Sequence, residues 1–134
     1  MHHINWLAVI VASVTGFALG AVWYAPPVFG NLWMKANKLS KEDLAGANMA
    51  RIFGTAILFT VLMAAGLAVF VVNHVEPHNL AAHLITGAAA GFWIICAFGI
   101  IALFERRPAA YVLINGGYCL LLMLVVAGII GSWR

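Results

Sequence analysis

Four long apolar stretches constrain the fold of this chain more than any other feature. They run from Ile4 to Ala25, from Arg51 to Asn73, from Leu80 to Phe104 and from Ala109 to Trp133. A helix needs about 20 mostly apolar residues to cross the roughly 30 Å of hydrocarbon in a bilayer. Each stretch is long enough, and together they occupy most of the 134 residues. The sequence therefore predicts one transmembrane domain, residues 1–134, with four spanning helices.

Composition excludes a water-soluble fold of this size. Hydrophobic residues make up 65% of the chain and charged residues 8%, whereas about a quarter of a typical globular protein is charged. The connections between the second, third and fourth stretches are short, which makes successive helices antiparallel neighbours. We therefore expect an all-α integral membrane four-helix bundle with antiparallel, up-down topology.

The positions of the basic residues predict how the chain is oriented. The first and third connections carry Lys35, Lys38, Lys41, Arg51, Arg106 and Arg107, and the opposite side carries only Arg134. Basic residues concentrate in cytoplasmic loops. We therefore expect these two connections inside the cell and both termini outside.

The segment after the first stretch predicts a short helix in the headgroup region. Pro26-Pro27 end the first helix, because proline cannot continue the backbone hydrogen-bond ladder. Phe29, Leu32, Trp33 and Ala36 then recur at helical spacing, with Asn31, Lys35 and Lys38 on another face. That pattern is typical of an interfacial helix whose lysines point toward anionic lipid. The alternative is an irregular linker.

A helix start is predicted at the end of this segment. Ser40 followed by Asp43 resembles a capping box, with aspartate in place of the usual glutamate. We expect the second long helix to begin near Lys41, in water, and to enter the membrane near Arg51.

Glycines give the clearest signal for helix packing. The candidates are Gly16, Gly20, Gly87, Gly91, Gly116, Gly117 and Gly128. The first four form two GxxxG pairs, which place small residues on one helix face and let another backbone approach. Two interpretations stay open: contacts inside one bundle, or an interface with a second copy or another membrane protein.

A layer of polar groups is expected near the middle of the membrane. At about 1.5 Å per residue, Thr15, Thr60, Trp93 and Tyr118 lie near mid-membrane, and Asn115 lies nearer the inner end of the last helix. Trp93, Asn115 and Tyr118 are expected to hydrogen-bond across the bundle, because a buried indole or phenol seeks a partner. They either bind the helices together or line a cavity for a small molecule.

Histidines on the predicted outer side suggest a possible metal site. His74, His78 and His83 accompany Glu76, and imidazoles with a carboxylate suit zinc, copper or nickel. However, Pro77 interrupts the pair His74 and His78, so the two need not share a helical face. We keep a metal site as an alternative.

Catalytic and nucleotide-binding patterns are lacking in the sequence. No nucleophile, base and orienting group converge by spacing, and neither a GxSxG motif nor a P-loop occurs. Glu42, Asp43, Glu76 and Glu105 all lie at or beyond helix ends, whereas proton-coupled transport relies on ionisable groups inside the membrane. We expect no enzymatic activity, no cofactor and no nucleic-acid partner.

Two distinctive clusters carry a resemblance to a known family. After Asn5-Trp6 and Gly20, the exit of the first helix contains Trp23, Tyr24, Pro26, Phe29, Gly30 and Trp33, and the last helix contains Asn115-Gly116-Gly117-Tyr118 and a stretch from Gly128 to Trp133. This pattern resembles the bacterial membrane proteins grouped as domain of unknown function family 1761. The resemblance covers nearly the whole chain, with Ala25 in place of a more usual serine. It implies a four-helix protein of the bacterial inner membrane without an assigned activity, and it points to the two clusters as the places to look for function.

These observations favour a non-enzymatic membrane protein that acts through helix packing. We expect membrane lipids as its surroundings and either a homo-oligomer or an accessory role beside other membrane subunits. The first alternative is a transporter or channel for a small neutral or hydrophobic solute, which would use Trp93, Tyr118 and Asn115. The second alternative is metal binding at the outer face.

Overall fold

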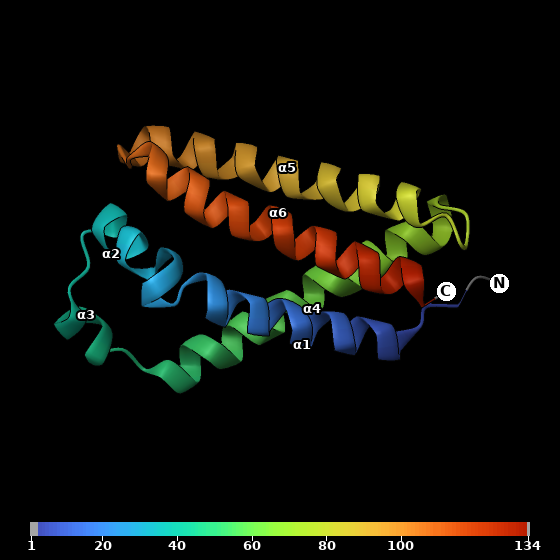
Figure 1. The fold of residues 1–134 in the computed structure, drawn as a ribbon, viewed down its shortest axis with the longest axis horizontal. Coiled ribbons are helices and arrows are strands. Elements are labelled where there is room, and N and C mark those ends of the chain that lie inside the picture. Colours follow the sequence, from blue (N-terminus) through green and yellow to red (C-terminus); the bar gives the residue numbers. More distant parts are fainter. Residues whose placement is uncertain (1–2, 134) are drawn as a thin grey trace.

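Helices make up the whole regular structure of the part of the chain that is described, residues 3–133 of a computed structural model. In chain order these are α1 (Trp6–Trp23), a π-helical turn η1 (Pro26–Gly30), α2 (Asn31–Asn37), α3 (Lys41–Ala45), α4 (Met49–His74), α5 (Leu80–Glu105) and α6 (Ala109–Ser132). Figure 1 shows the four long helices side by side, with the two termini at one end. The prediction of an all-α bundle is confirmed.

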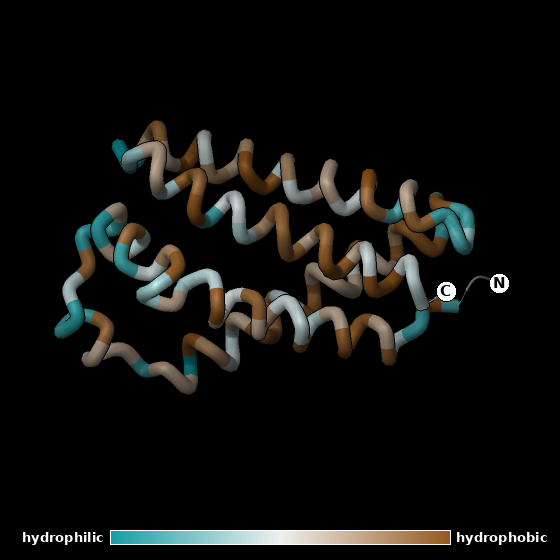
Figure 2. Tube along the Cα trace, viewed as in Figure 1, coloured by the Kyte–Doolittle hydropathy of each residue, from teal (hydrophilic) through white to brown (hydrophobic). Residues whose placement is uncertain are grey.

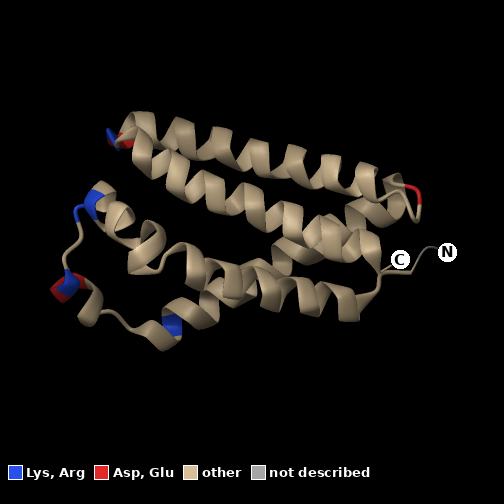
Figure 3. Cartoon of the chain, in the orientation of Figure 1, with Lys and Arg blue, Asp and Glu red and all other residues tan. Residues whose placement is uncertain are grey.

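Four of these helices are long and apolar enough to cross a membrane. They are α1, α4, α5 and α6, with mean hydropathies between 1.9 and 2.5. Figure 2 shows hydrophobic residues along the helices and hydrophilic ones mainly at the two ends of the bundle. Figure 3 shows that the charged residues lie at those two ends. This distribution matches a multi-pass membrane protein whose middle lies in hydrocarbon.

The apolar core lies between α1, α4 and α6. Its buried residues are Val9, Ala12, Ala64, Leu67, Ala68, Val71, Leu122, Met123, Val126, Ala127 and Ile130. Helix α5 contributes none of these and instead lies against α6 through small residues. Gly87 and Gly91 are buried there, and an added Cβ would lie 2.6 Å from the Met123 carbonyl oxygen or 2.7 Å from the Leu120 Cα. The α5–α6 pair therefore depends on the close backbone approach that its GxxxG spacing predicts.

Helices α4 and α5 are not the close neighbours that their short connection led us to expect. They make few contacts with each other, whereas α4 packs mainly against α1. In Figure 1, α4 starts near α3 and crosses behind α1, and it meets α5 only near their connection. The physical reason is that α4 directs Ala64, Leu67 and Val71 toward α1 and α6. The expectation that α4 and α5 pack closely as neighbours is therefore wrong, although the two helices run in opposite directions as predicted.

The first connection is folded rather than irregular. The π-helical turn η1 runs directly into α2, and α2 packs against both η1 and α6. A short helix after α1 is present as predicted, and the alternative of an irregular linker is wrong. The C-cap of α2 is Lys38, which adopts the left-handed conformation with φ 55°.

The second long helix begins later than the sequence suggested. The capping box is confirmed, since Asp43 N donates to Ser40 Oγ (3.1 Å) and Ser40 N donates to Asp43 Oδ2 (2.8 Å). The hydrogen bond from the Ser40 backbone lowers the pKa of the exposed Asp43 carboxyl group. However, this box starts only the short helix α3, which ends at Ala45 with Gly46 as its C-cap. Asn48 caps a new helix by accepting from Arg51 N (3.1 Å). A single helix from Lys41 is therefore wrong.

Candidate functional site

The exit of α1 and the first half of α6 form the best-defined polar site in the described chain. Trp23 lies in the last turn of α1, and its indole Nε1 donates to the Ile114 carbonyl oxygen at 3.0 Å. Tyr24 caps the same helix, and its hydroxyl donates to Asn115 Oδ1 at 2.7 Å. We call the group Trp23, Tyr24, Asn115 and Tyr118 the α1–α6 junction. It joins the two clusters that carry the family resemblance.

Asn115 uses both ends of its amide in this junction. Its oxygen accepts from Tyr24, and its Nδ2 donates to the Tyr111 carbonyl oxygen at 3.0 Å, one turn earlier in α6. Only 9% of the residue is exposed. A buried amide is costly unless its polar atoms are paired. Helix α6 supplies the acceptor for the Asn115 amide nitrogen, and the Tyr24 hydroxyl of the α1 exit supplies the donor for the Asn115 amide oxygen.

Tyr118 completes the junction one turn deeper in the bundle. Its hydroxyl donates to the Gly16 carbonyl oxygen of α1 at 3.2 Å. The rings of Tyr24 and Tyr118 meet edge to face with centroids 5.4 Å apart, and Tyr24 meets Trp33 of α2 in the same way at 5.7 Å. Such aromatic pairs add to the stabilisation from burial. The junction thus fixes α1, α2 and α6 at one depth.

Glycines leave the room that these rings occupy. A Cβ at Gly20 would lie 2.9 Å from the Tyr118 hydroxyl, and one at Gly117 would lie 3.2 Å from the Trp23 ring. In η1, a Cβ at Gly30 would collide with the Tyr24 carbonyl oxygen. The packing role proposed for these positions inside one bundle agrees with this geometry. Gly16 and Gly116 are similarly crowded, by Leu122 and Ile95 respectively, whereas Gly128 has only an ordinary contact with Leu84.

The other end of α1 is also tied to α6. Asn5 Oδ1 accepts from Ala8 N at 3.1 Å and so caps α1, while Asn5 Nδ2 donates to the Trp133 carbonyl oxygen at 3.1 Å. Hydrogen bonds between side chain and backbone therefore hold α1 to α6 near both ends of the pair.

The predicted midplane cluster is not a single group. Trp93 is 73% exposed on α5, so the expectation that its buried indole bonds to Asn115 and Tyr118 is wrong. Thr15 is exposed and donates to the Val11 carbonyl oxygen, and buried Thr60 donates to the Ala56 carbonyl oxygen. Both threonines satisfy their hydroxyls within their own helices. Asn115 and Tyr118 do bond across the bundle, but their partners come from α1.

Trp93 instead lines a groove between α4 and α5. The groove has a volume of about 440 Å³, and its lining includes Gly66, Thr86, Ala89, Ala90 and Trp93, with Met123 of α6. A Cβ added at Gly66 would meet nothing within 4 Å. We call this the α4–α5 groove. It is an apolar hollow with small residues in its walls, on the side where α4 and α5 diverge.

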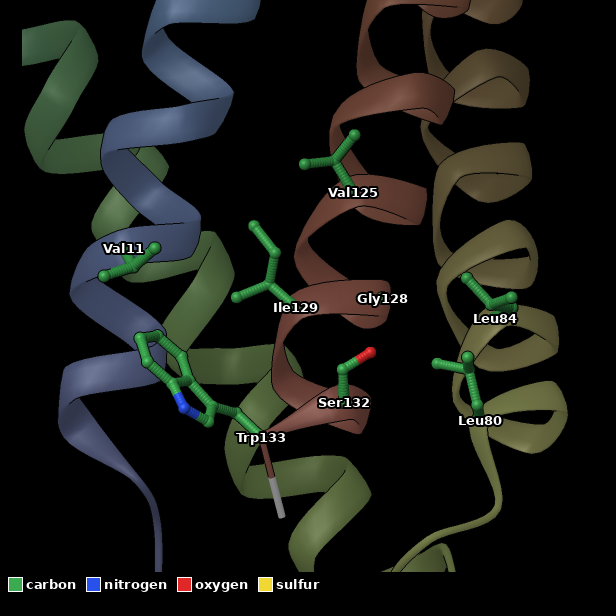
Figure 4. A pocket seen from close by; sticks show the side chains of 8 residues that line it. All are labelled: Val11, Leu80, Leu84, Val125, Gly128, Ile129, Ser132 and Trp133. Carbon is green, nitrogen blue, oxygen red and sulfur yellow. The ribbon is translucent and has the colours of Figure 1, made fainter.

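A second hollow lies on the other side of α6. It has a volume of about 610 Å³ and is lined by Val11 of α1, Leu80 and Leu84 of α5, and Val125, Gly128, Ile129, Ser132 and Trp133 of the last helix and its cap. Figure 4 shows these side chains facing the space between α1 and α5, with Ser132 and Trp133 near one end. Helix α5 is thus flanked by a hollow on each side and is held mainly by α6.

The histidines proposed as metal ligands do not form a cluster. No group of three or more His, Cys, Asp or Glu side chains suited to a metal ion is found among residues 3–133. His74 bonds to the Phe70 carbonyl oxygen, and His83 bonds to the Asn79 carbonyl oxygen in a fully buried position against Gly131. Glu76 and His78 are exposed in the α4–α5 connection. His74 and His83 therefore have separate backbone partners, and the four residues do not form one site.

The pairing inside the junction could have been found from depth alone. Helix α1 runs toward the basic end of the bundle and α6 runs away from it, so Trp23-Tyr24 and Asn115 lie at similar depth. The sequence points to both clusters, but the partner expected for Asn115 and Tyr118, Trp93, lies on α5. In the described chain every buried side-chain nitrogen and oxygen has a hydrogen-bond partner, so this arrangement suits holding helices together.

The apolar spans, the charges at the two ends and the paired polar groups between helices define a helical multi-pass membrane protein. The chain belongs to the family described as Protein of unknown function (DUF1761), whose model matches residues 7–131. The resemblance of the two clusters to this family is thereby confirmed. No curated protein and no solved structure matches the chain.

Proposed function

We propose that this protein is a non-enzymatic membrane protein that acts by packing against other transmembrane helices. It does so either as a homo-oligomer or as an accessory subunit of a larger membrane complex. The α4–α5 groove is the contact surface, and α4 and α5 provide equal numbers of the side chains that a partner helix would touch.

The incomplete packing of α5 carries this proposal. In the most apolar 18-residue window of α5, 17% of the window is buried inside the protein, whereas the corresponding share in α6 is 39%. A helix inside a bundle normally contacts neighbours on two sides, but α5 contacts mainly α6. The open face has Gly66 and Ala89 in the groove walls and Trp93 beside them. Small residues let helix backbones approach closely within a membrane, and aromatic residues are frequent anchors of interfaces.

The state of assembly in a lipid environment tests the proposal. The protein would be extracted with its surrounding lipid into polymer-bounded discs, and the mass of the intact particle would be measured. We expect a homo-oligomer or a fixed ratio to a second membrane protein. Gly66→Leu should fill the groove and release the partner. Gly54→Leu is the matched control, because Gly54 lies on the same helix, has nothing within 4 Å and is not in the groove lining.

Two results would contradict the proposal. One is a wild-type monomer accompanied by lipid alone. The other is an equal effect of Gly66→Leu and Gly54→Leu on the assembly, which would show that the groove is no special contact surface.

The same proposal includes a location in the bacterial inner membrane with both termini outside. All basic residues in the described range lie at one end of the bundle, on the α2–α3 side and at the α5–α6 connection. Cysteines introduced at Lys38 and Arg106 should react with a membrane-impermeant label only after the cells are opened. Labelling of either position from outside intact cells would contradict the proposed orientation.

Transport of a small hydrophobic solute is a second candidate function. It is favoured by the volumes of the two hollows, about 440 and 610 Å³, which fall in the range of small-molecule sites. Trp93 would then contact the solute in the α4–α5 groove. Leakage of a hydrophobic dye from vesicles containing the protein, reduced by Trp93→Ala, would support this function over helix packing.

A further inference from the structure

The strongest concentration of charge outside the junction lies at one end of the bundle. It contains Lys35, Lys38, Lys41, Arg51, Arg106 and Arg107, together with Glu42, Asp43 and Glu105 (Figure 3). In the range 3–133, the opposite end carries only Glu76 among the acidic and basic residues. Basic residues therefore outnumber acidic ones two to one at the first end, although neither function proposed above uses this charge.

Five of these six basic residues have no carboxylate partner among the described residues, and three of the five lie near one another in the fold. The ion pair found there joins Arg107 to Glu105, with Arg107 Nε 3.4 Å from Glu105 Oε2. Lys35, Lys38 and Arg106 are exposed and take no part in an ion pair within residues 3–133. Their charge is therefore available to an external anion.

The fold places these three residues at neighbouring helix ends. Lys38 caps α2 and Arg106 caps α5, each with left-handed backbone (φ 55° and 56°) stabilised by hydrogen bonds to the preceding turn. Helix α2 packs against α6, which begins just after the α5 cap. Figure 1 shows α2 and the α5–α6 connection at the same end of the molecule.

Apolar surface directly adjoins the basic group. Leu103 and Phe104 in the last turn of α5 are 80% and 88% exposed, and Leu32 of α2 is 54% exposed. A soluble anion would gain nothing from these side chains. An amphiphile that carries its negative charge at the membrane surface would meet the basic residues with its headgroup and the apolar residues with its chains.

We infer that Lys35, Lys38 and Arg106 bind the phosphate headgroup of an anionic phospholipid, with its acyl chains beside Leu103 and Phe104. Charge complementarity selects the anionic headgroup over a zwitterionic one, and the exposed apolar turn selects a lipid over free phosphate. Each basic residue near an anionic membrane surface raises affinity by about five-fold.

Lipid retention by the purified full chain tests this site. The protein would be placed in discs of equal parts phosphatidylglycerol and phosphatidylcholine, and the lipids that stay bound after release would be counted by native mass spectrometry. We expect phosphatidylglycerol to be retained preferentially. The double variant Lys35→Gln/Lys38→Gln should lower this preference at least ten-fold, and the Lys35→Arg/Lys38→Arg variant should restore it.

The control variant Lys41→Gln/Arg51→Gln removes the same charge at exposed positions of α3 and α4. It should keep the preference within about two-fold, and circular dichroism should show that both double variants are folded. Equal losses in the two double variants would overturn the site in favour of diffuse attraction. Equal retention of the two lipids, or displacement of the bound lipid by millimolar inorganic phosphate, would also overturn it. None of these results depends on the state of assembly.

Discussion

Two helix pairs in this molecule, α1–α6 and α4–α5, pack in different ways. Between α1 and α6, hydrogen bonds from side chains join the two helices near both ends of the pair, and Gly20 and Gly117 leave room for the rings of Tyr118 and Trp23. Between α4 and α5, few contacts form, and Gly66 meets nothing within 4 Å. One pair is thus complete within the chain, and the other is open.

The contrast teaches how to interpret small residues in a membrane helix. A glycine whose added Cβ would collide with a neighbour, as at Gly91, serves the fold of the single chain. A glycine in open space, such as Gly54, Gly66 or Gly99, does not. Sequence alone presents both kinds identically. The difference depends on which face of each helix turns toward its neighbour.

The largest effect is expected from Gly91→Leu in the closed α5–α6 contact. The new side chain would meet the Leu120 backbone, since even a Cβ would lie 2.7 Å from the Leu120 Cα. Overpacking commonly costs about 1–3 kcal/mol, and collision with backbone places this variant at or above the top of that range. Unfolding in mixed micelles would measure the loss. Wild-type stability in Gly91→Leu would show that α5 does not lie against α6 as described.

The next effect is expected from Asn115→Leu in the α1–α6 junction. Leucine has a similar size but leaves the Tyr24 hydroxyl without its acceptor. An unpaired buried polar group costs about 1–3 kcal/mol, so the free energy of unfolding should fall by about that amount. Tyr24→Phe combined with Asn115→Leu should recover part of the loss. If the double variant is as unstable as the sum of the single variants, the bond between Tyr24 and Asn115 makes no contribution.

A smaller effect is expected from Tyr118→Phe. This change removes the hydrogen bond to the Gly16 carbonyl oxygen and keeps the ring that packs against Tyr24. Hydrogen bonds between transmembrane helices average about 0.6 kcal/mol, so the loss should be close to that value. A loss above about 2 kcal/mol in the same unfolding assay would show that the hydroxyl does more than join α1 to α6.

The smallest effect on stability is expected from Gly66→Leu in the α4–α5 groove. With nothing within 4 Å of its Cβ position, the change should alter the free energy of unfolding of the dissociated chain by less than about 0.5 kcal/mol. The comparison between the two helix pairs breaks down if this variant destabilises the dissociated chain as much as Gly91→Leu does.

The sequence was sufficient to predict the features that depend on local pattern. Hydropathy predicted the four spanning helices, and the spacing of Phe29 and Trp33 predicted a helix after α1. Prediction from the sequence failed where two signals for a helix start lie close together. Lys41 to Arg51 reads as one helix start, but Gly46 ends a short helix and Asn48 caps the next one.

The site was predicted in part, and for a physical reason. Asn115 and Tyr118 were correctly expected to bond across the bundle, because buried polar groups need partners. Their true partners, Tyr24 and the Gly16 carbonyl oxygen, depend on which helix lies beside α6. Trp93 was misplaced because hydropathy gives the depth of a residue and not the direction in which its side chain points. The two faces of α5 therefore could not be assigned to protein or lipid from the sequence.

Photo-crosslinking in native membranes at position 93 tests the central claim most directly. A benzophenone amino acid would replace Trp93 in the α4–α5 groove, and the same amino acid would replace Leu103, which is 80% exposed on the same helix and outside the groove. If the groove receives a partner helix, irradiation should give a discrete protein adduct from position 93 and none from position 103. Adducts to lipid alone at both positions would contradict the claim that the open helix pair is a protein interface.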